Sequence, residues 1–187
     1  LAREQEMAID PELFAALRKR MTLSPLTARE PDISIEDAYR ISLRLLERRK
    51  AEGERVIGKK IGVTSKPVQD MLGVHQPDFG FLTDAMHVAD GATVSLSQYK
   101  LIQPRAEGEI AFVLKKDLRG PGVTEEQVLD ATDYVAACFE IVDSRIKDWK
   151  IKIQDTVADN ASCGIFVIGA HRVDPRSLDL AAARMDI

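Results

Sequence analysis

Apolar positions follow two different spacings along the chain, and the change falls near residue 55. Two stripes of helical spacing come first: Phe14, Leu17 and Met21, then Ala38, Ile41 and Leu45. Asp10 before Pro11 predicts the start of one helix, and Ser34 with Asp37 three residues later predicts the start of another. We therefore expect a helical N-terminal portion over residues 1–55.

After residue 55 the apolar residues gather in short runs of strand length. These runs lie at 56–64, 110–114, 137–143 and 165–168. Turn-forming residues separate them, and 76–80 is typical of a loop. Thr124 with Gln127 forms a capping box that predicts one further helix. The pattern indicates an α+β chain in which residues 56–187 form a strand-rich unit.

Composition narrows the class of protein. Of the 187 residues, 45% are hydrophobic and 30% are charged, which is typical of a soluble globular chain with a sizeable core. The net charge of −4 argues against a nucleic-acid binder, and no apolar run reaches the roughly 20 residues that span a membrane. With no secretory signal pattern and only Cys138 and Cys163 as thiols, we expect a cytoplasmic protein with reduced cysteines.

Two glutamates, Glu107 and Glu109, stand just before the 110–114 run. If the strand begins at or before Glu107, they share one face, roughly 6–7 Å apart along the backbone. A hard divalent cation would neutralise such a pair, and Glu140, in the middle of the 137–143 run, would supply a third carboxylate. The spacing is equally compatible with two solvated glutamates at the start of an edge strand.

Three other residues are candidates for chemistry. Lys60 alternates with the glycines at 58 and 62, as expected where a ligand approaches the backbone, and an exposed edge-strand lysine would show the same pattern. Asp78 is either a turn former or a catalytic acid. Ser162 lies in the small-residue segment 159–164, which can face an anionic ligand or form a plain turn.

Several motifs carry a resemblance to a known family. They lie at 58–65, 76–80, 104–109, 139–145 and 159–162. In this order they resemble the 2-hydroxypenta-2,4-dienoate hydratases (2-oxopent-4-enoate hydratases) of the fumarylacetoacetate hydrolase superfamily. 4-Oxalocrotonate decarboxylase of the same superfamily shares the fold and the acidic site, but the Lys-Lys and Gln-Pro-Asp-Phe-Gly motifs are more similar to the hydratases.

The resemblance implies a mixed β-roll with a helical N-terminal portion, a Mg²⁺ or Mn²⁺ ion, a small 2-hydroxydienoate substrate and a homo-oligomer. It also implies roles for single residues: metal binding for Glu107, Glu109 and Glu140, acid–base work for Lys60 and Asp78, and substrate contact for Ser162. Chains of this family continue well past residue 187. We therefore expect a roll that is truncated at its C-terminus, and the activity of the truncated chain is left open.

The implied reaction adds water to 2-hydroxypenta-2,4-dienoate and gives 4-hydroxy-2-oxopentanoate, in the meta-cleavage degradation of aromatic compounds. The metal would stabilise an enolate, and Lys60 and Asp78 would share the proton transfers in an order that sequence does not decide. Two alternatives stay open. One is a decarboxylase of the same superfamily, and the other is a non-catalytic scaffold subunit in a complex with a decarboxylase or the downstream aldolase.

Overall fold

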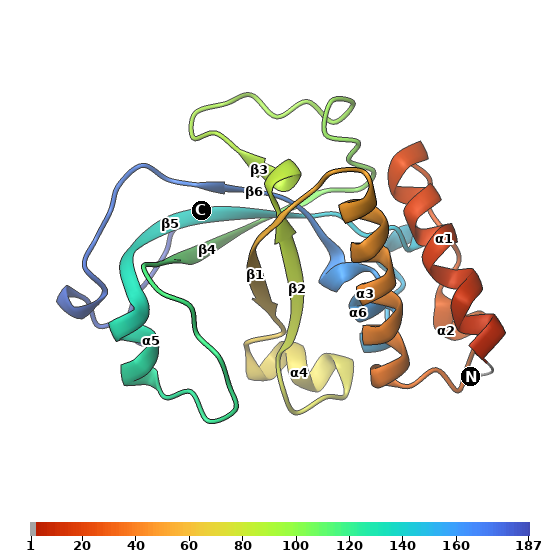
Figure 1. Cartoon of the computed structure of the whole chain (residues 1–187), viewed down its shortest axis with the longest axis horizontal. Helices are drawn as coiled ribbons and strands as arrows, with labels where there is room; N and C mark the ends of the chain where they lie inside the picture. The colour runs from red at the N-terminus through yellow and green to blue at the C-terminus, as the bar shows by residue number, and fades with distance from the viewer. Residues whose placement is uncertain (1–2) are drawn as a thin grey trace.

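The computed structural model describes residues 3–187, with side chains from Ile9 onward. Helices form one side of the molecule: α1 (Arg3–Lys19), α2 (Leu26–Arg29), α3 (Ile35–Ala51) and α6 (Ile153–Ala158) (Figure 1). Their apolar residues make the largest core cluster of the described chain, in which Leu13, Ile41 and Val157 are fully buried. None of the helices within residues 3–187 is both long and apolar enough to cross a membrane.

The first helix begins earlier than the sequence predicts. It runs from Arg3, so Asp10 does not cap it and Pro11 is an interior residue. The buried Asp10 carboxylate instead accepts hydrogen bonds from Arg44 Nε (3.1 Å) and Arg48 Nε (2.5 Å) of α3. The prediction was wrong because ion pairs with a second helix use the carboxylate that the local pattern assigns to a cap.

The two capping boxes are confirmed. Ser34 Oγ accepts a hydrogen bond from the Asp37 backbone N–H (3.0 Å), and the Asp37 carboxylate accepts one from the Ser34 backbone N–H (3.0 Å). Thr124 and Gln127 exchange the same pair of bonds at the start of α5 (Glu125–Ala131). Both caps join residues three positions apart, so residue spacing alone is enough to predict them.

The strands form two separate sheets. In one, β1 (Val56–Gly62) pairs antiparallel with β2 (Asp78–Thr83), and α4 (Lys66–Leu72) connects them. The other has the order β3 (His87–Val88), β6 (Cys163–Ile168), β5 (Thr132–Val142) and β4 (Arg105–Leu114). The β1–β2 hairpin stands between the four-stranded sheet and the helices (Figure 1), and β2 contacts both β6 and α6.

The loop predicted at 76–80 is wrong in its second part, because β2 begins at Asp78. Across the hairpin, Asp78 pairs with Gly62 and Gly80 pairs with Lys60. Pairing with β1 overrides the turn-forming composition of this segment, since strand formation depends on the available partner more than on local preference. Asp78 is therefore a strand residue, held in fixed register with β1.

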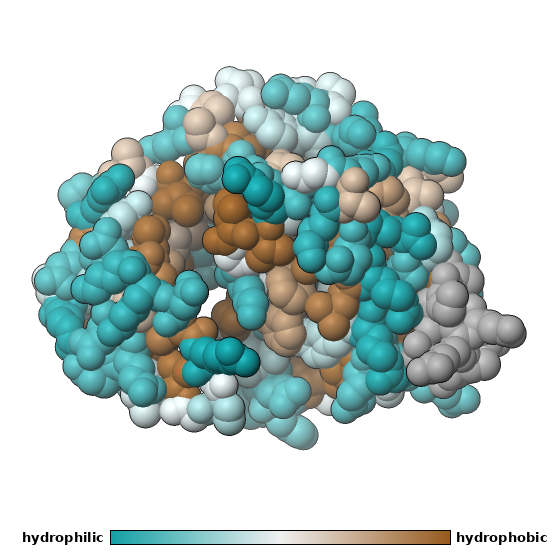
Figure 2. Space-filling view, viewed as in Figure 1, coloured by the Kyte–Doolittle hydropathy of each residue, from teal (hydrophilic) through white to brown (hydrophobic). Residues whose placement is uncertain are grey.

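The two faces of β1 differ in burial. Ile57 and Ile61 are 53% and 55% exposed, whereas Lys60 and Gly62 turn inward. Figure 2 shows hydrophobic side chains gathered over the hairpin at the centre of this view. The predicted alternation of Lys60 with the glycines is confirmed, and the polar face of this hairpin is the inner one.

Candidate active site

Three carboxylates lie on one face of the four-stranded sheet. β4 begins at Arg105, before Glu107, and in the β4–β5 register Glu107 stands opposite Glu140. Glu109 stands opposite Cys138 on the same pair of strands. Residues directly opposite one another in an antiparallel pair project from the same face. Glu107, Glu109 and Glu140 therefore share one surface, here called the acid face, on which only Glu140 is buried.

The ammonium group of Lys60 meets the acid face from the hairpin. Lys60 Nζ lies 3.2 Å from Glu140 Oε1 and donates a hydrogen bond to the Ala161 carbonyl oxygen (3.0 Å). Only 11% of the Lys60 side chain is exposed, so the alternative of an exposed edge-strand lysine is wrong. Burial lowers the pKa of Lys60, but the negative surroundings, Glu140 foremost, outweigh burial and hold it above the ordinary value. Lys60 is therefore protonated at neutral pH.

Glu140 sits in surroundings that disfavour its charge. Burial raises the pKa of Glu140, Lys60 opposes that rise and Glu107 adds to it. Among the described residues Glu140 Oε1 has no assigned hydrogen-bond donor, and Lys60 Nζ forms an ion pair with it at 3.2 Å. Burial, followed by the repulsion of Glu107, also raises the pKa of Glu109. The acid face thus carries negative charge that Lys60 alone does not compensate.

Asp78 lies beside Lys60 on the inner face of the hairpin and is 4% exposed. A Cβ added at Gly62 would stand 2.4 Å from Asp78 Oδ1 and 3.1 Å from Lys60 Nζ, so any larger residue here would displace these two side-chain ends. Burial raises the pKa of Asp78, against the opposing effect of Lys60. Asp78 Oδ1 has no hydrogen-bond partner among residues 9–187, which leaves a buried acceptor for a ligand or a proton.

Ser162 lies at the end of a strained turn next to these groups. Its buried hydroxyl is 3.0 Å from the Thr156 hydroxyl, and either group can donate. Asn160, Ala161 and Ser162 have left-handed φ angles of 55°, 51° and 52°. Non-glycine residues keep this conformation where their surroundings overdetermine it, and such strain gathers at functional sites. The turn carries the Ala161 carbonyl that binds Lys60, while the Ser162 hydroxyl is already paired.

Sequence reasoning missed the charged pair that supports this turn. Arg145 Nε donates to Asp159 Oδ1 (2.5 Å). The two Nη atoms of Arg145 donate to the carbonyl oxygens of Asp159 (2.7 Å) and Cys163 (3.2 Å). Both charged side chains are buried. The two residues are 14 positions apart in the chain, and no spacing rule predicts a contact at that separation. The available signal in the sequence was the charge of Arg145 soon after the apolar strand that ends at Val142.

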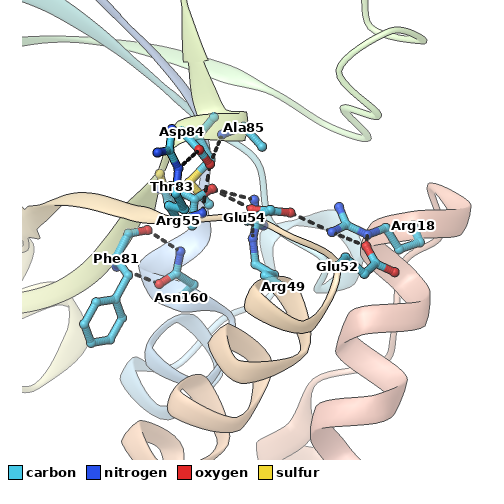
Figure 3. Close-up of polar contacts among 12 residues, drawn as sticks. Arg18, Arg49, Glu52, Glu54, Arg55, Phe81, Thr83, Asp84, Ala85 and Asn160 are labelled. Atoms are coloured by element: carbon cyan, nitrogen blue, oxygen red, sulfur yellow. Dashed lines mark hydrogen bonds and ion pairs between the residues drawn. The ribbon is translucent and has the colours of Figure 1, made fainter.

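A second polar network joins the helices to the end of β2 (Figure 3). Glu54 accepts hydrogen bonds from Arg18 Nη2 (2.7 Å), Arg49 Nε (2.8 Å) and the Thr83 hydroxyl (2.6 Å). Burial raises the pKa of Glu54, but the hydrogen bond from Thr83 and the charge of Arg49 outweigh it and leave the pKa below its ordinary range. The network anchors the hairpin to α1 and α3 at the end away from Asp78.

The acid face has the donors that a hard divalent cation prefers. Among residues 9–187, whose side chains the structure describes, no three His, Cys, Asp or Glu side chains converge closely enough to hold a metal ion. Nonetheless, three carboxylates share one sheet face, and the buried Glu140 Oε1 has a charged neighbour, Lys60, but no hydrogen-bond donor among the described residues. An all-oxygen set of this kind suits Mg²⁺ or Mn²⁺, and the exposed Glu107 and Glu109 have the rotamer freedom to turn towards Glu140. The donor set therefore fits such an ion.

Relatives of known name match most of this chain. It is 73% identical over 175 residues to 2-hydroxyhexa-2,4-dienoate hydratase of Comamonas testosteroni. The aligned region covers 94% of this chain and 66% of that relative. It is 69% identical over 174 residues to 2-hydroxypent-2,4-dienoate hydratase of Pseudomonas putida, with 93% and 78% covered. The chain thus spans just under two thirds of the length of the Comamonas relative.

A solved structure and a family model agree with these relatives. The structure of 4-oxalocrotonate decarboxylase from Pseudomonas putida G7, complexed with magnesium and adipate, matches with a TM-score of 0.90 at 36% identity, over 96% of this chain and 68% of that chain. The family model described as fumarylacetoacetate (FAA) hydrolase C-terminal matches residues 50–187. The predicted fold type is confirmed, and the chain belongs to the fumarylacetoacetate hydrolase family.

Proposed function

We propose that this chain carries the active site of a metal-dependent hydratase that adds water to 2-hydroxypenta-2,4-dienoate and yields 4-hydroxy-2-oxopentanoate. The observation that carries the proposal is the identity of 73% and 69% to two proteins named as hydratases of 2-hydroxydienoates. The juxtaposition of Lys60 and Asp78 with the acid face supports it, because the reaction needs proton transfer beside a bound anion.

In this proposal Glu107, Glu109 and Glu140 hold Mg²⁺ or Mn²⁺. The solved decarboxylase of the same fold is complexed with magnesium, and carboxylate oxygens are the donors that such ions take. When bound, the cation would supply Lewis-acid stabilisation of the substrate's enolate and carboxylate oxygens. Burial is the leading cause of the raised pKa values of Glu109 and Glu140, and the negative charge of Glu107 adds to it. The ion would offset this negative charge.

The chain's own residues divide the proton transfers. We assign to Lys60 Nζ, which is protonated at neutral pH, the donation of a proton to carbon 5 as the dienol ketonises. The proton lost from the enol hydroxyl returns to Lys60 through water. We assign to Asp78 Oδ1 the acceptance of a proton from the water that adds at carbon 4, since this oxygen is buried and unpartnered among residues 9–187. Asp78 then passes this proton to carbon 3, which completes the addition. Ser162 is proposed as a substrate contact. Its hydroxyl would then replace the hydrogen bond to the Thr156 hydroxyl with one to the substrate.

The direct test measures loss of dienol absorbance by the purified chain with Mg²⁺ and 2-hydroxypenta-2,4-dienoate. We expect loss of absorbance without release of CO₂. The nearest alternative is a decarboxylase, which is supported by the 36% identity to the solved 4-oxalocrotonate decarboxylase. This alternative predicts CO₂ release from 4-oxalocrotonate. The scaffold hypothesis predicts no turnover of either substrate. The homo-oligomer and a complex with a decarboxylase or the downstream aldolase stay predictions.

A metal titration tests the carboxylate site separately from turnover. Glu109→Gln removes one negative charge from the acid face, and we expect Mg²⁺ affinity measured by calorimetry to fall at least about tenfold, or about 1.4 kcal/mol. Glu125→Gln, on the exposed surface of α5, is the matched control and should bind as the wild type does. Equal affinities in all three proteins would remove the acid face as the metal site.

A further inference from the structure

The hairpin that carries Lys60 and Asp78 belongs to a different sheet from the acid face. Lys60 lies on β1, whereas Glu140 lies on β5 of the four-stranded sheet. Among residues 3–187, no strand pairing joins the two sheets. The 3.2 Å approach of Lys60 Nζ to Glu140 therefore depends on contacts between the hairpin and a segment attached to the other sheet.

Asn160 makes such a contact with one β2 residue (Figure 3). Its Oδ1 accepts a hydrogen bond from the Phe81 backbone N–H (2.8 Å), and its Nδ2 donates one to the Phe81 carbonyl oxygen (3.0 Å). A single side chain thus pairs both polar groups of Phe81, as a neighbouring strand would. A Cβ added at Gly80 would stand 2.6 Å from the Asn160 carbonyl oxygen, so the two backbones are in close contact here. Gly80 is the residue that pairs with Lys60 across the hairpin.

The turn that carries Asn160 is also attached to the four-stranded sheet. The next residue, Ala161, accepts the Lys60 hydrogen bond through its carbonyl oxygen. The Ser162 carbonyl oxygen accepts from the backbone N–H of Asp143 (2.7 Å), directly after β5 ends. β6 then begins at Cys163 and pairs with β5. The turn is therefore fixed to the sheet on one side and to the hairpin, through Asn160, on the other.

Asparagine suits this position for two reasons. Its φ of 55° is left-handed, a conformation that asparagine tolerates better than most residues. Its amide offers one acceptor and a donor, which the Phe81 N–H and carbonyl require together. Aspartate would keep the acceptor and lose the donor, and glycine would keep the backbone conformation and lose both.

We propose that Asn160 is a positioning residue, which holds Lys60 against the acid face by clamping β2 to the turn. Its importance for catalysis rests on the proposed function, because Lys60 is the proton donor there. Loss of the clamp frees the hairpin to move away from Ala161 and Glu140, and Lys60 becomes more accessible. The amount of bound substrate should change less than the rate of its conversion, since Asn160 acts on Lys60 and does not touch the acid face itself.

The test compares Asn160→Gly and Asn160→Asp with the wild type, each in the presence of Mg²⁺. Acetylation of Lys60 is measured by mass spectrometry at one pH, relative to the exposed neighbour Lys59 in the same protein. We expect the Lys60-to-Lys59 ratio to rise several-fold in both variants, and kcat to fall more than KM rises. Arg55→Gln is the control, because it removes only the exposed ion pair with Asp84 in the same region (Figure 3).

An unchanged labelling ratio in a folded Asn160 variant would overturn the proposal. A second measurement needs no variant: the Phe81 N–H of the wild type should be strongly protected from hydrogen exchange, since Asn160 is its acceptor, and rapid exchange would overturn the proposal as well. Neither readout requires turnover. Failure of the wild type to consume the dienoate would therefore count against the proposed function only. The labelling ratio and the hydrogen exchange would still test whether Asn160 positions Lys60.

Discussion

Lys60→Met is expected to lower kcat of the hydratase reaction by roughly 10²–10⁴-fold, the range typical of a lost general acid or base. Methionine fills the space of the buried lysine stem but removes the ammonium group. The proton donor is then lost, and Glu140 Oε1 and the Ala161 carbonyl lose their contact with it. The measurement is steady-state turnover of the dienoate at saturating Mg²⁺.

Lys59→Met provides the matched control for this prediction. Lys59 is the preceding residue of β1, but it is exposed on the opposite face of the hairpin. We expect this variant to turn over the substrate as the wild type does. A Lys60→Met protein that folds, binds Mg²⁺ and is as active as Lys59→Met would refute the assignment of Lys60 as an acid–base group.

Arg145→Met is expected to reduce the free energy of unfolding by about 3–5 kcal/mol, the cost typical of breaking a buried ion pair by removing one partner. Arg145 binds one carboxylate oxygen and two carbonyl oxygens in a region from which water is excluded. Methionine leaves all three acceptors without these donors and leaves the Asp159 charge buried. Urea unfolding can be followed through Trp149, the only tryptophan of the chain.

The pH dependence of this variant provides a second check. Burial already raises the pKa of Asp159 from 3.8 to about 6 while Arg145 opposes the rise. Without Arg145 the folded-state pKa should rise further, and the unfolded value stays near 3.8. The stability that a group with a raised pKa contributes is present below the unfolded pKa and is lost as pH rises through the folded pKa. The variant should therefore lose stability more steeply than the wild type as pH rises above about 6.

The exposed Arg55–Asp84 pair is the control for burial. The Arg55 side chain is 82% exposed, and surface ion pairs contribute little because water screens them. Arg55→Met should leave the urea midpoint nearly unchanged at every pH. Equal midpoints for Arg145→Met and Arg55→Met would show that the Arg145–Asp159 pair does not stabilise the turn that carries Asn160.

Local relations in the chain were predictable because they connect residues only a few positions apart. The capping boxes at Ser34 and Thr124 follow from residues three apart, and the shared face of Glu107 and Glu109 follows from the period of two in a strand. Glu140 was noticed because a carboxylate in an apolar run needs a partner. The recognition of the family, and with it the fold type, also came from the motifs of the chain.

Sequence alone therefore determined the caps at Ser34 and Thr124, most strands and the set of candidate site residues. Only the tertiary structure decided which of these residues meet. Lys60 and Ala161 are 101 positions apart, and Phe81 and Asn160 are 79 apart. Contacts between distant residues also explain the two wrong predictions. Asp78 is a strand residue because it pairs with β1, and Asp10 does not cap α1 because its carboxylate binds arginines of α3. Periodicity encodes the neighbours of a residue along one element, whereas pairing between elements depends on how the whole chain packs.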